Sequence, residues 1–178
     1  MSIAQNFFKE TIDENGCLTD IQAHWPDNFN FGYDVVDAIA QETPDKRALV
    51  WCNTENEEHI FTFGDIREQS SRAANALLKA GVKRGDRVML ALKRHYEYWF
   101  ISIALHKIGA VMIPVTHMLT TEDFIYRIRS AKVKAVICTP MDEVPEKVKA
   151  AVEELNADCL LWTVKETVPG FENFSEAC

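Results

Sequence analysis

The sequence predicts an α/β fold: a partial parallel sheet with helices on both faces. In the second half of the chain, short apolar segments alternate with helix-forming segments, which is the pattern of strand–helix–strand crossovers. The apolar segments lack polar alternation, as expected for strands that helices cover on both sides. We divide the 178 residues into an irregular, aromatic-rich arm, residues 1–33, and an incomplete α/β domain, residues 34–178.

A short helix and a hairpin precede this alternation. The helix is expected at residues 34–42 and ends before Thr43-Pro44, because the residue before a proline avoids the helical region. Two strands, residues 48–52 and 59–63, flank a polar turn of hairpin length at residues 53–57. We therefore expect a preceding β-hairpin beside the sheet.

A longer helix follows the hairpin directly. Thr62 and Asp65 have the spacing of a capping box, in which each side chain accepts a hydrogen bond from the other residue's backbone amide. Lys79 lies in the last turn, and Gly81 follows as the left-handed residue that ends the helix.

The alternating region then gives four strands and three helices. The expected strands are 87–92, 110–113, 133–138 and 159–164, and the expected helices are 96–107, 121–130 and 144–155. No helix is expected after the last strand, so the chain looks cut short there. The strand's outer edge, with Leu160, Leu161 and Trp162, should be unpaired, and we expect self-association through residues near 159–178.

The composition excludes several classes of protein. The net charge of −8 disfavours nucleic acid as a partner, because phosphate binding requires clusters of Lys and Arg. No apolar run approaches the roughly 20 residues of a membrane span, and the first residues lack a secretory signal pattern. The five cysteines form no C-x-x-C pair, so we expect reduced thiols in a cytoplasmic protein.

The usual catalytic and nucleotide signatures do not occur in this sequence. Its glycines form neither a G-x-G-x-x-G turn nor a G-x-x-x-x-G-K-[ST] phosphate loop. There is no G-x-S-x-G elbow and no H-E-x-x-H helix. We expect no catalytic residue and no metal site within the chain.

Four basic residues lie around one expected strand: Arg84, Arg87, Lys93 and Arg94. The simplest interpretation is a solvated rim, and the alternative is an anionic ligand near the end of the strand.

Three segments resemble the core motifs of the adenylate-forming enzymes, which include acyl-CoA synthetases, luciferases and peptide-synthetase adenylation domains. They are residues 61–66, 79–88 and 106–115, and they stand in the family's order and spacing. Residues 29–35 and 114–129 are most similar to medium-chain acyl-CoA synthetases. The resemblance covers about residues 30–165. In the family these motifs are mostly architectural.

The resemblance implies the N-terminal fragment of an enzyme that activates a small-molecule carboxylic acid. The complete enzyme would use ATP, CoA and Mg²⁺: the acid forms an acyl-adenylate with release of pyrophosphate, and the CoA thiol displaces AMP. The family's phosphate loop, ribose-binding Asp and catalytic Lys have no counterpart in this sequence. The fragment itself is therefore expected to be inactive and to bind none of these groups tightly.

One ligand contact is also implied by the resemblance. Thr116, His117 and Met118 occupy the place where medium-chain synthetases have a residue touching CoA, and loops at this end of a parallel sheet commonly bind ligands. The family commonly has a polar amide near Met118, and the alternative is ordinary loop packing.

Two other functions stay open at this point. One is a stand-alone, non-catalytic binding or assembly module of the same fold. The other is a part of an aryl-acid or peptide-synthetase adenylation enzyme. A reading frame that continues downstream into a phosphate loop would favour a synthetase fragment over a stand-alone module.

Overall fold

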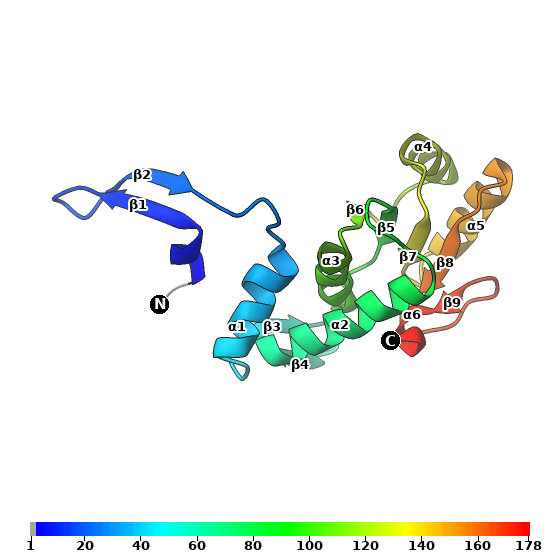
Figure 1. Cartoon of the computed structure of the whole chain (residues 1–178). Coiled ribbons are helices and arrows are strands. Elements are labelled where there is room, and N and C mark those ends of the chain that lie inside the picture. The colour runs from blue at the N-terminus through cyan, green and yellow to red at the C-terminus, as the bar shows by residue number, and fades with distance from the viewer. Residues whose placement is uncertain (1–2) are drawn as a thin grey trace.

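A computed structural model describes residues 3–178 of the chain and shows a slender arm attached to a compact body (Figure 1). In the arm, a 3₁₀ turn at Ile3–Asn6 leads into strands β1 (Phe8–Ile12) and β2 (Leu18–Ala23), which pair antiparallel. The expectation of an irregular arm is therefore wrong over these residues.

The turn of this first hairpin explains why it forms. The Asp13 carboxylate accepts hydrogen bonds from the backbone amides of Asn15, at 2.9 Å, and Cys17, at 2.8 Å. Gly16 adopts φ +80°, a conformation that glycine tolerates best. These short-range contacts reverse the chain without help from the body.

A π-helix, Phe31–Asp37, connects the arm to helix α1 (Ala38–Glu42). The helical segment therefore begins three residues before the predicted start, because the Asn30 side chain accepts from the Gly32 amide at 2.9 Å and caps it. α1 ends at Glu42, directly before Thr43-Pro44, as predicted.

Strands β3 (Arg47–Cys52) and β4 (Glu58–Thr62) form the predicted second hairpin, and helix α2 (Phe63–Lys79) follows at once. The predicted capping box is confirmed: Thr62 Oγ1 accepts from the Asp65 amide at 3.1 Å, and the Asp65 carboxylate accepts from the Thr62 amide at 2.8 Å. Gly81 is left-handed, at φ +91°.

The alternating region forms the predicted parallel sheet. Its elements are β5 (Arg87–Ala91), α3 (Glu97–Ile108), β6 (Val111–Pro114), α4 (Thr121–Ala131), β7 (Ala135–Cys138), α5 (Val144–Leu155) and β8 (Leu160–Thr163). The strand order is β6-β5-β7-β8-β9, with every pair parallel. Thr120 caps α4, and Pro114 is the last residue of β6.

Helices cover both faces of the sheet. Successive residues of β5 enter different cores: Leu90 packs with α2 and α3, and Met89 packs with α4 and α5. Both side chains are buried, which is why the strands show no polar alternation.

The end of the chain differs from the prediction. Residues Glu172–Asn173 form a short strand, β9, beside β8, and helix α6 (Phe174–Ala177) follows. Trp162 is buried and its Nε1 donates to Glu172 at 3.1 Å. The outer edge of β8 is thus paired at Trp162, which removes much of the basis for self-association through this edge. Gly170, at φ +89°, lies in the connection after which β9 runs parallel to β8.

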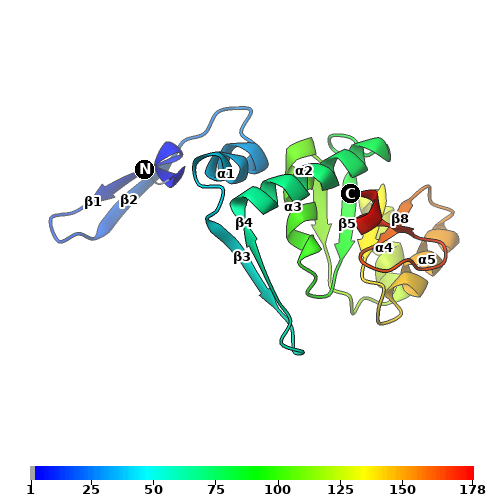
Figure 2. The same cartoon turned by 90° about the horizontal axis from the view of Figure 1, so that it is seen from below.

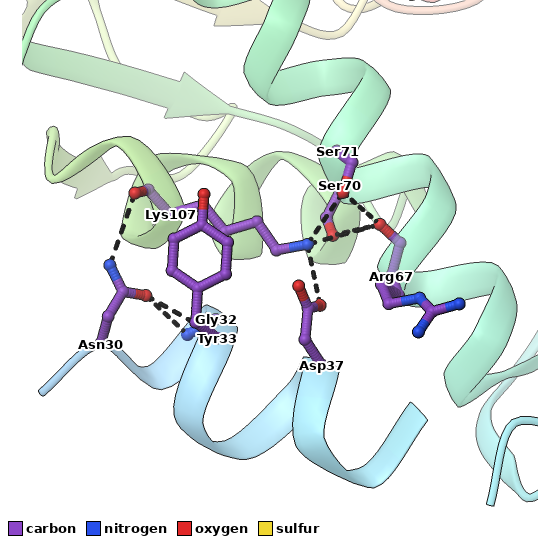
Figure 3. Close-up of polar contacts among 8 residues, drawn as sticks. All are labelled: Asn30, Gly32, Tyr33, Asp37, Arg67, Ser70, Ser71 and Lys107. Atoms are coloured by element: carbon purple, nitrogen blue, oxygen red, sulfur yellow. Dashed lines mark hydrogen bonds and ion pairs between the residues drawn. The ribbon is translucent and has the colours of Figure 1, made fainter. Parts of the chain in front are cut away.

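A buried lysine fixes the arm's connection to the body (Figure 3). Lys107 Nζ, on α3, lies 2.8 Å from Asp37 Oδ1 and donates to Ser71 Oγ of α2 at 3.0 Å. The contact with Asp37 is an ion pair rather than an aligned hydrogen bond, and the Lys107 side chain is 1% exposed. One charge therefore joins the connecting helix to α2 and α3.

The backbone of the connecting segment approaches the Lys107 stem closely. A Cβ on Gly32 would lie 2.7 Å from Lys107 Cγ, so only glycine fits here without displacement. Asn30 Nδ2 donates to the His106 carbonyl at 2.7 Å, at the end of α3. The segment is thus held by both side-chain and backbone contacts.

Candidate functional site

The candidate site is the edge of the sheet where the parallel strands have their carboxyl ends. In folds of this class ligands bind at this edge, in loops that follow different strands. Figure 2 shows that the β3–β4 hairpin extends toward the same end of the sheet to which β5 points. The site is therefore built from the loops after β5, β6, β7 and β8, together with this hairpin.

His95, in the loop after β5, is a buried histidine at this edge. It is 8% exposed, and its Nε2 lies 3.0 Å from the Oγ1 of Thr139, which follows β7. Burial is the main cause that lowers the pKa of His95 to about 4, with smaller contributions from the nearby charges of Lys165 and Lys93. His95 is therefore neutral near pH 7 and tightly positioned.

An ion pair connects the same two loops nearer to solvent. Lys93 Nζ lies 2.7 Å from Asp142 Oδ2. This hydrogen bond is the largest cause that lowers the pKa of Asp142, and His117 and Lys147 contribute smaller electrostatic effects. Arg94 and Asp142 have positive φ values, 53° and 59°; such non-glycine conformations are costly and concentrate at functional sites.

The three residues predicted to touch CoA lie together in the loop after β6. Thr116 is exposed and its Oγ1 accepts from the Met118 amide at 3.2 Å. Met118 is 74% exposed, and His117 is near enough to Asp142 to affect its pKa. The structure brings the three to the candidate edge, beside its outermost strand. A contact with CoA stays a prediction.

The β3–β4 hairpin brings an aromatic cluster to the edge. Lys165, from the loop after β8, places its Nζ 4.6 Å from the Tyr96 ring centroid and 5.3 Å from that of Trp51. Trp51 Nε1 also donates to the Arg94 carbonyl at 2.6 Å. Burial raises the pKa of the neighbouring Glu97. Sequence reasoning missed this cluster, because nothing in the spacing of these residues indicates that they meet.

The basic cluster predicted around one strand is two separate groups. Arg84 and Arg87 lie near the amino end of β5, where Arg87 donates to the carbonyls of Ala131, at 2.7 Å, and Gly85, at 2.9 Å. Lys93 and Arg94 follow the carboxyl end. An anionic ligand at the candidate edge could therefore meet Lys93 and Arg94 but not the other pair.

Potential metal ligands are scattered over the described residues rather than grouped. Within residues 3–178, no group of three or more His, Cys, Asp or Glu side chains is placed to hold a metal ion. Burial raises the pKa of Cys138 to about 12, so this thiol is protonated and a poor nucleophile.

In residues 3–178 no helix combines the length and the apolar character needed to cross a bilayer.

Known proteins share both sequence and fold with this chain. Residues 36–175 match the family model of the AMP-binding enzymes. The chain is 33% identical over 177 residues to mitochondrial acyl-coenzyme A synthetase ACSM4 of Mus musculus, covering 93% of this chain and 30% of that protein. It is 36% identical over 162 residues to mitochondrial ACSM5 of Rattus norvegicus, covering 85% and 27%.

Solved structures agree at the level of the fold. A putative long-chain-fatty-acid CoA ligase from Rhodopseudomonas palustris superposes with a TM-score of 0.73 at 21% identity, covering 85% of this chain and 36% of that one. A benzoate CoA ligase from Burkholderia xenovorans gives 0.67 at 21%, covering 84% and 28%.

Two consequences follow from the curated relatives. The chain spans about 30% or less of their length, from 26% to 30% for the two ACSM4 proteins of rat and mouse. The expectation of a cytoplasmic protein is contradicted, because these relatives are mitochondrial acyl-coenzyme A synthetases. The absence of a secretory signal pattern could not distinguish these two compartments.

Proposed function

Because the chain belongs to the AMP-binding enzyme family, we propose that it is the amino-terminal portion of an ATP-dependent acyl-CoA synthetase. The complete enzyme joins a small-molecule carboxylic acid to CoA and converts ATP into AMP and pyrophosphate. The observation that carries the proposal is the family match over residues 36–175, which include the whole five-stranded sheet.

In this proposal the chain supplies the scaffold of one ligand-binding edge rather than reacting groups. The sheet is rigid because both of its faces are buried, and loops at its carboxyl edge are held by the His95–Thr139 and Lys93–Asp142 contacts. A rigid scaffold keeps ligand-binding loops in place. We assign no reaction step to these side chains, because residues 3–178 hold no group of three or more His, Cys, Asp or Glu side chains placed to bind a metal ion.

The loop Thr116–Met118 is our candidate for the CoA contact. The exposed Met118 side chain offers apolar surface. The Thr116 hydroxyl accepts a hydrogen bond from the Met118 amide, which fixes the backbone of the loop. This pairing of a fixed backbone with a free apolar side chain suits the slender pantetheine arm of CoA.

The activity is tested with two polypeptides. The 178-residue chain should give ATP–pyrophosphate exchange equal to a blank with acetate, butyrate, octanoate or benzoate. A longer product of the same reading frame that includes a phosphate loop should release AMP only when an acid and CoA are both present. Exchange by the short chain, or no such activity in a longer product that carries a phosphate loop, would contradict the proposal.

The CoA contact is tested within the longer product. Met118→Glu should raise the KM for CoA several-fold and leave the KM for ATP unchanged, because it places a like charge beside an anionic ligand. Met141→Glu is the matched control, since Met141 is also exposed at this edge, 50%, but follows a different strand. Equal effects of the two variants would assign Thr116–Met118 to loop packing.

A further inference from the structure

The β3–β4 hairpin forms a sheet of its own, separate from the five-stranded sheet that carries the candidate edge. A two-stranded hairpin alone is marginally stable in water, and packing against other elements supplies the missing stability. The position of the hairpin at the edge therefore depends on its side chains. Two directly opposed pairs share one face, Leu49 with Phe61 and Trp51 with His59. All four side chains are half-buried.

Tyr96 is the residue of the body on which this face packs. It directly precedes α3, and its ring centroid lies 5.4 Å from that of Trp51, 5.1 Å from that of Phe61 and 5.1 Å from that of His59. Tilted and edge-on pairs at these distances are attractive beyond the area that they bury. Trp51 Nε1 also donates to the Arg94 carbonyl at 2.6 Å, so the hairpin is joined to the loop after β5 as well.

Lys165 completes this aromatic cluster from the loop after β8. Its Nζ lies 4.6 Å from the Tyr96 ring centroid and 5.3 Å from that of Trp51, within the range in which an aromatic face attracts an ammonium group. Among residues 3–178, no carboxylate lies within 4.0 Å of Lys165 Nζ. The charge is therefore matched by the two rings rather than by an ion pair.

The backbone of Lys165 is fixed before its side chain leaves the loop. Its φ is +63°, a left-handed conformation that costs a non-glycine residue free energy and persists where surrounding contacts enforce it. Its amide donates to Ser175 Oγ at 3.0 Å, and its carbonyl accepts from Asn173 Nδ2 at 3.1 Å. Both partners belong to the β9–α6 segment, so the side chain enters the cluster from a fixed point.

We propose that Lys165 is a positioning residue of the candidate edge: its ammonium group, in contact with the Tyr96 and Trp51 rings, holds the β3–β4 hairpin against the start of α3. Through the hydrogen bond from Trp51 to Arg94, the hairpin in turn fixes the loop that carries His95. One side chain thereby connects the loops after β8 and β5. The inference rests on the proposed function only in treating this edge as the one that binds ligands.

The alternative is that the aromatic rings hold the hairpin by themselves and that Lys165 only lies on them. The two cases differ in what the charge does. Methionine keeps an unbranched apolar stem but has no charge, whereas arginine keeps the charge and also stacks on aromatic rings. Lys165→Met should therefore release the hairpin, and Lys165→Arg should keep it in place.

The Trp51 indole N–H reports the position of the hairpin, because it is hydrogen-bonded to the Arg94 carbonyl. Its hydrogen exchange is followed by NMR in the 178-residue chain. Loss of the cation–π contact in Lys165→Met should speed this exchange roughly tenfold, because exchange of a protected group follows the free energy of local opening. In Lys165→Arg the rate should stay close to the original.

Two controls keep the result specific. Lys132→Met is the matched variant, because Lys132 is also exposed and also left-handed, at φ +50°, but lies at the amino end of β7. It should leave the exchange of Trp51 unchanged. The Trp162 indole N–H, which donates to Glu172, is the reference within each spectrum and should keep its rate in all three variants.

A second readout is the pKa of His95. Burial is the main cause that lowers it, and the charges of Lys165 and Lys93 add smaller contributions. Lys165→Met should therefore raise the pKa of His95 toward its ordinary value, and Lys165→Arg should leave it low. Lys93→Met should also raise this pKa but should not speed the exchange of Trp51, because Lys93 pairs with Asp142 instead. NMR titration of the imidazole measures all three.

The outcomes separate the two cases. Unchanged exchange of Trp51 in Lys165→Met overturns the inference, because the aromatic rings then hold the hairpin alone. Equal acceleration in Lys165→Met and Lys165→Arg overturns it too, since the contact would not depend on charge. If Trp51 and Trp162 speed up together, the substitution loosens the end of β8 as a whole, which also contradicts a specific contact with the hairpin. These measurements use no enzymatic activity, so their failure leaves the proposed function untouched.

Discussion

The body and the arm of this molecule use the same residue types in opposite ways. In the body, β7 is buried along its whole length, and helices cover it on both faces. In the arm, every residue of β1 and β2 is exposed. The apolar side chains of the body therefore hold its fold together, whereas those of the arm contribute to stability only when a partner covers them.

The segment between the two regions contributes to the stability of the body. Lys107 is buried and ion-paired to Asp37, and the Gly32 backbone lies against its stem. A buried charge needs its partner, because desolvation of an unpaired ammonium costs several kcal/mol. The boundary between stabilising and non-stabilising residues thus falls near Asn30, not at the end of the arm.

The largest difference between the two regions should come from truncating an apolar side chain in each. Phe124 is fully buried, so Phe124→Ala should lower the free energy of unfolding by about 4 kcal/mol. Ile12 is 58% exposed, so Ile12→Ala should change it by less than about 0.5 kcal/mol. Urea unfolding measures both, at a concentration where the chain is monomeric. A similar loss for both would mean that the arm packs on the body.

The next largest effect should come from the connecting segment. Asp37→Ala leaves the Lys107 ammonium buried without a counter-charge and should cost about 3 kcal/mol. Asp45→Ala, at an exposed position, should cost little. The double variant Asp37→Leu/Lys107→Met removes both charges, so its free energy of unfolding in urea should recover most of what Asp37→Ala loses. If Asp37→Ala behaves like Asp45→Ala, the connecting helix does not depend on the ion pair.

The sequence predicted the body far better than the arm. Regular periodicity and local capping signals are sufficient for α2 and the sheet, because the Thr62–Asp65 contacts involve neighbouring residues. The arm hairpin depends on one Asp13 turn, and strand β9 on only two residues, so neither shows a clear period. Neither element is therefore predictable from a periodic pattern in the sequence.

The candidate site was predictable in place but not in detail. The rule for parallel strands indicates the edge at which ligands bind, and the family resemblance implied that Thr116–Met118 contact a ligand there; that contact stays a prediction. The contacts of Lys165 with Trp51 and Tyr96 join three separate segments, and no local pattern reports them. Lys107 was equally hidden, since a lysine on a helix usually predicts a solvent-facing side chain.

A pH titration sharpens the comparison for a buried and an exposed histidine. The pKa of His95 is lowered from 6.5 to about 4 in the folded protein, so the unfolded chain binds more protons between these values. Stability should therefore fall as the pH drops from 6.5 toward 4, and this contribution should level off below pH 4. The full shift corresponds to about 3 kcal/mol, and screening by the solvent that still reaches the imidazole reduces the expected loss to about 2 kcal/mol.

The matched variants identify the residue responsible. His95→Gln can keep a hydrogen bond to Thr139 but does not titrate, so it should flatten this part of the profile. His24→Gln, at an exposed position of the arm, should leave the profile as it is. Urea unfolding at a series of pH values measures the slopes. An unchanged slope in His95→Gln would assign the pH dependence to other groups.

The smallest expected effect comes from the same substitution, glycine to valine, at one left-handed position in each region. Gly81, after α2, and Gly16, in the arm turn, adopt φ +91° and +80°, and an added Cβ would meet no atom within 4 Å at either position. Valine at each position is therefore strained by its backbone conformation alone, at about 1 kcal/mol or more.

In Gly81→Val this strain should appear directly as a lower midpoint of thermal unfolding. In Gly16→Val the midpoint should stay the same while the amides of β1 and β2 exchange hydrogen faster, because the hairpin opens without disturbing the body. Equal midpoint shifts in the two variants would show that arm and body unfold as one unit.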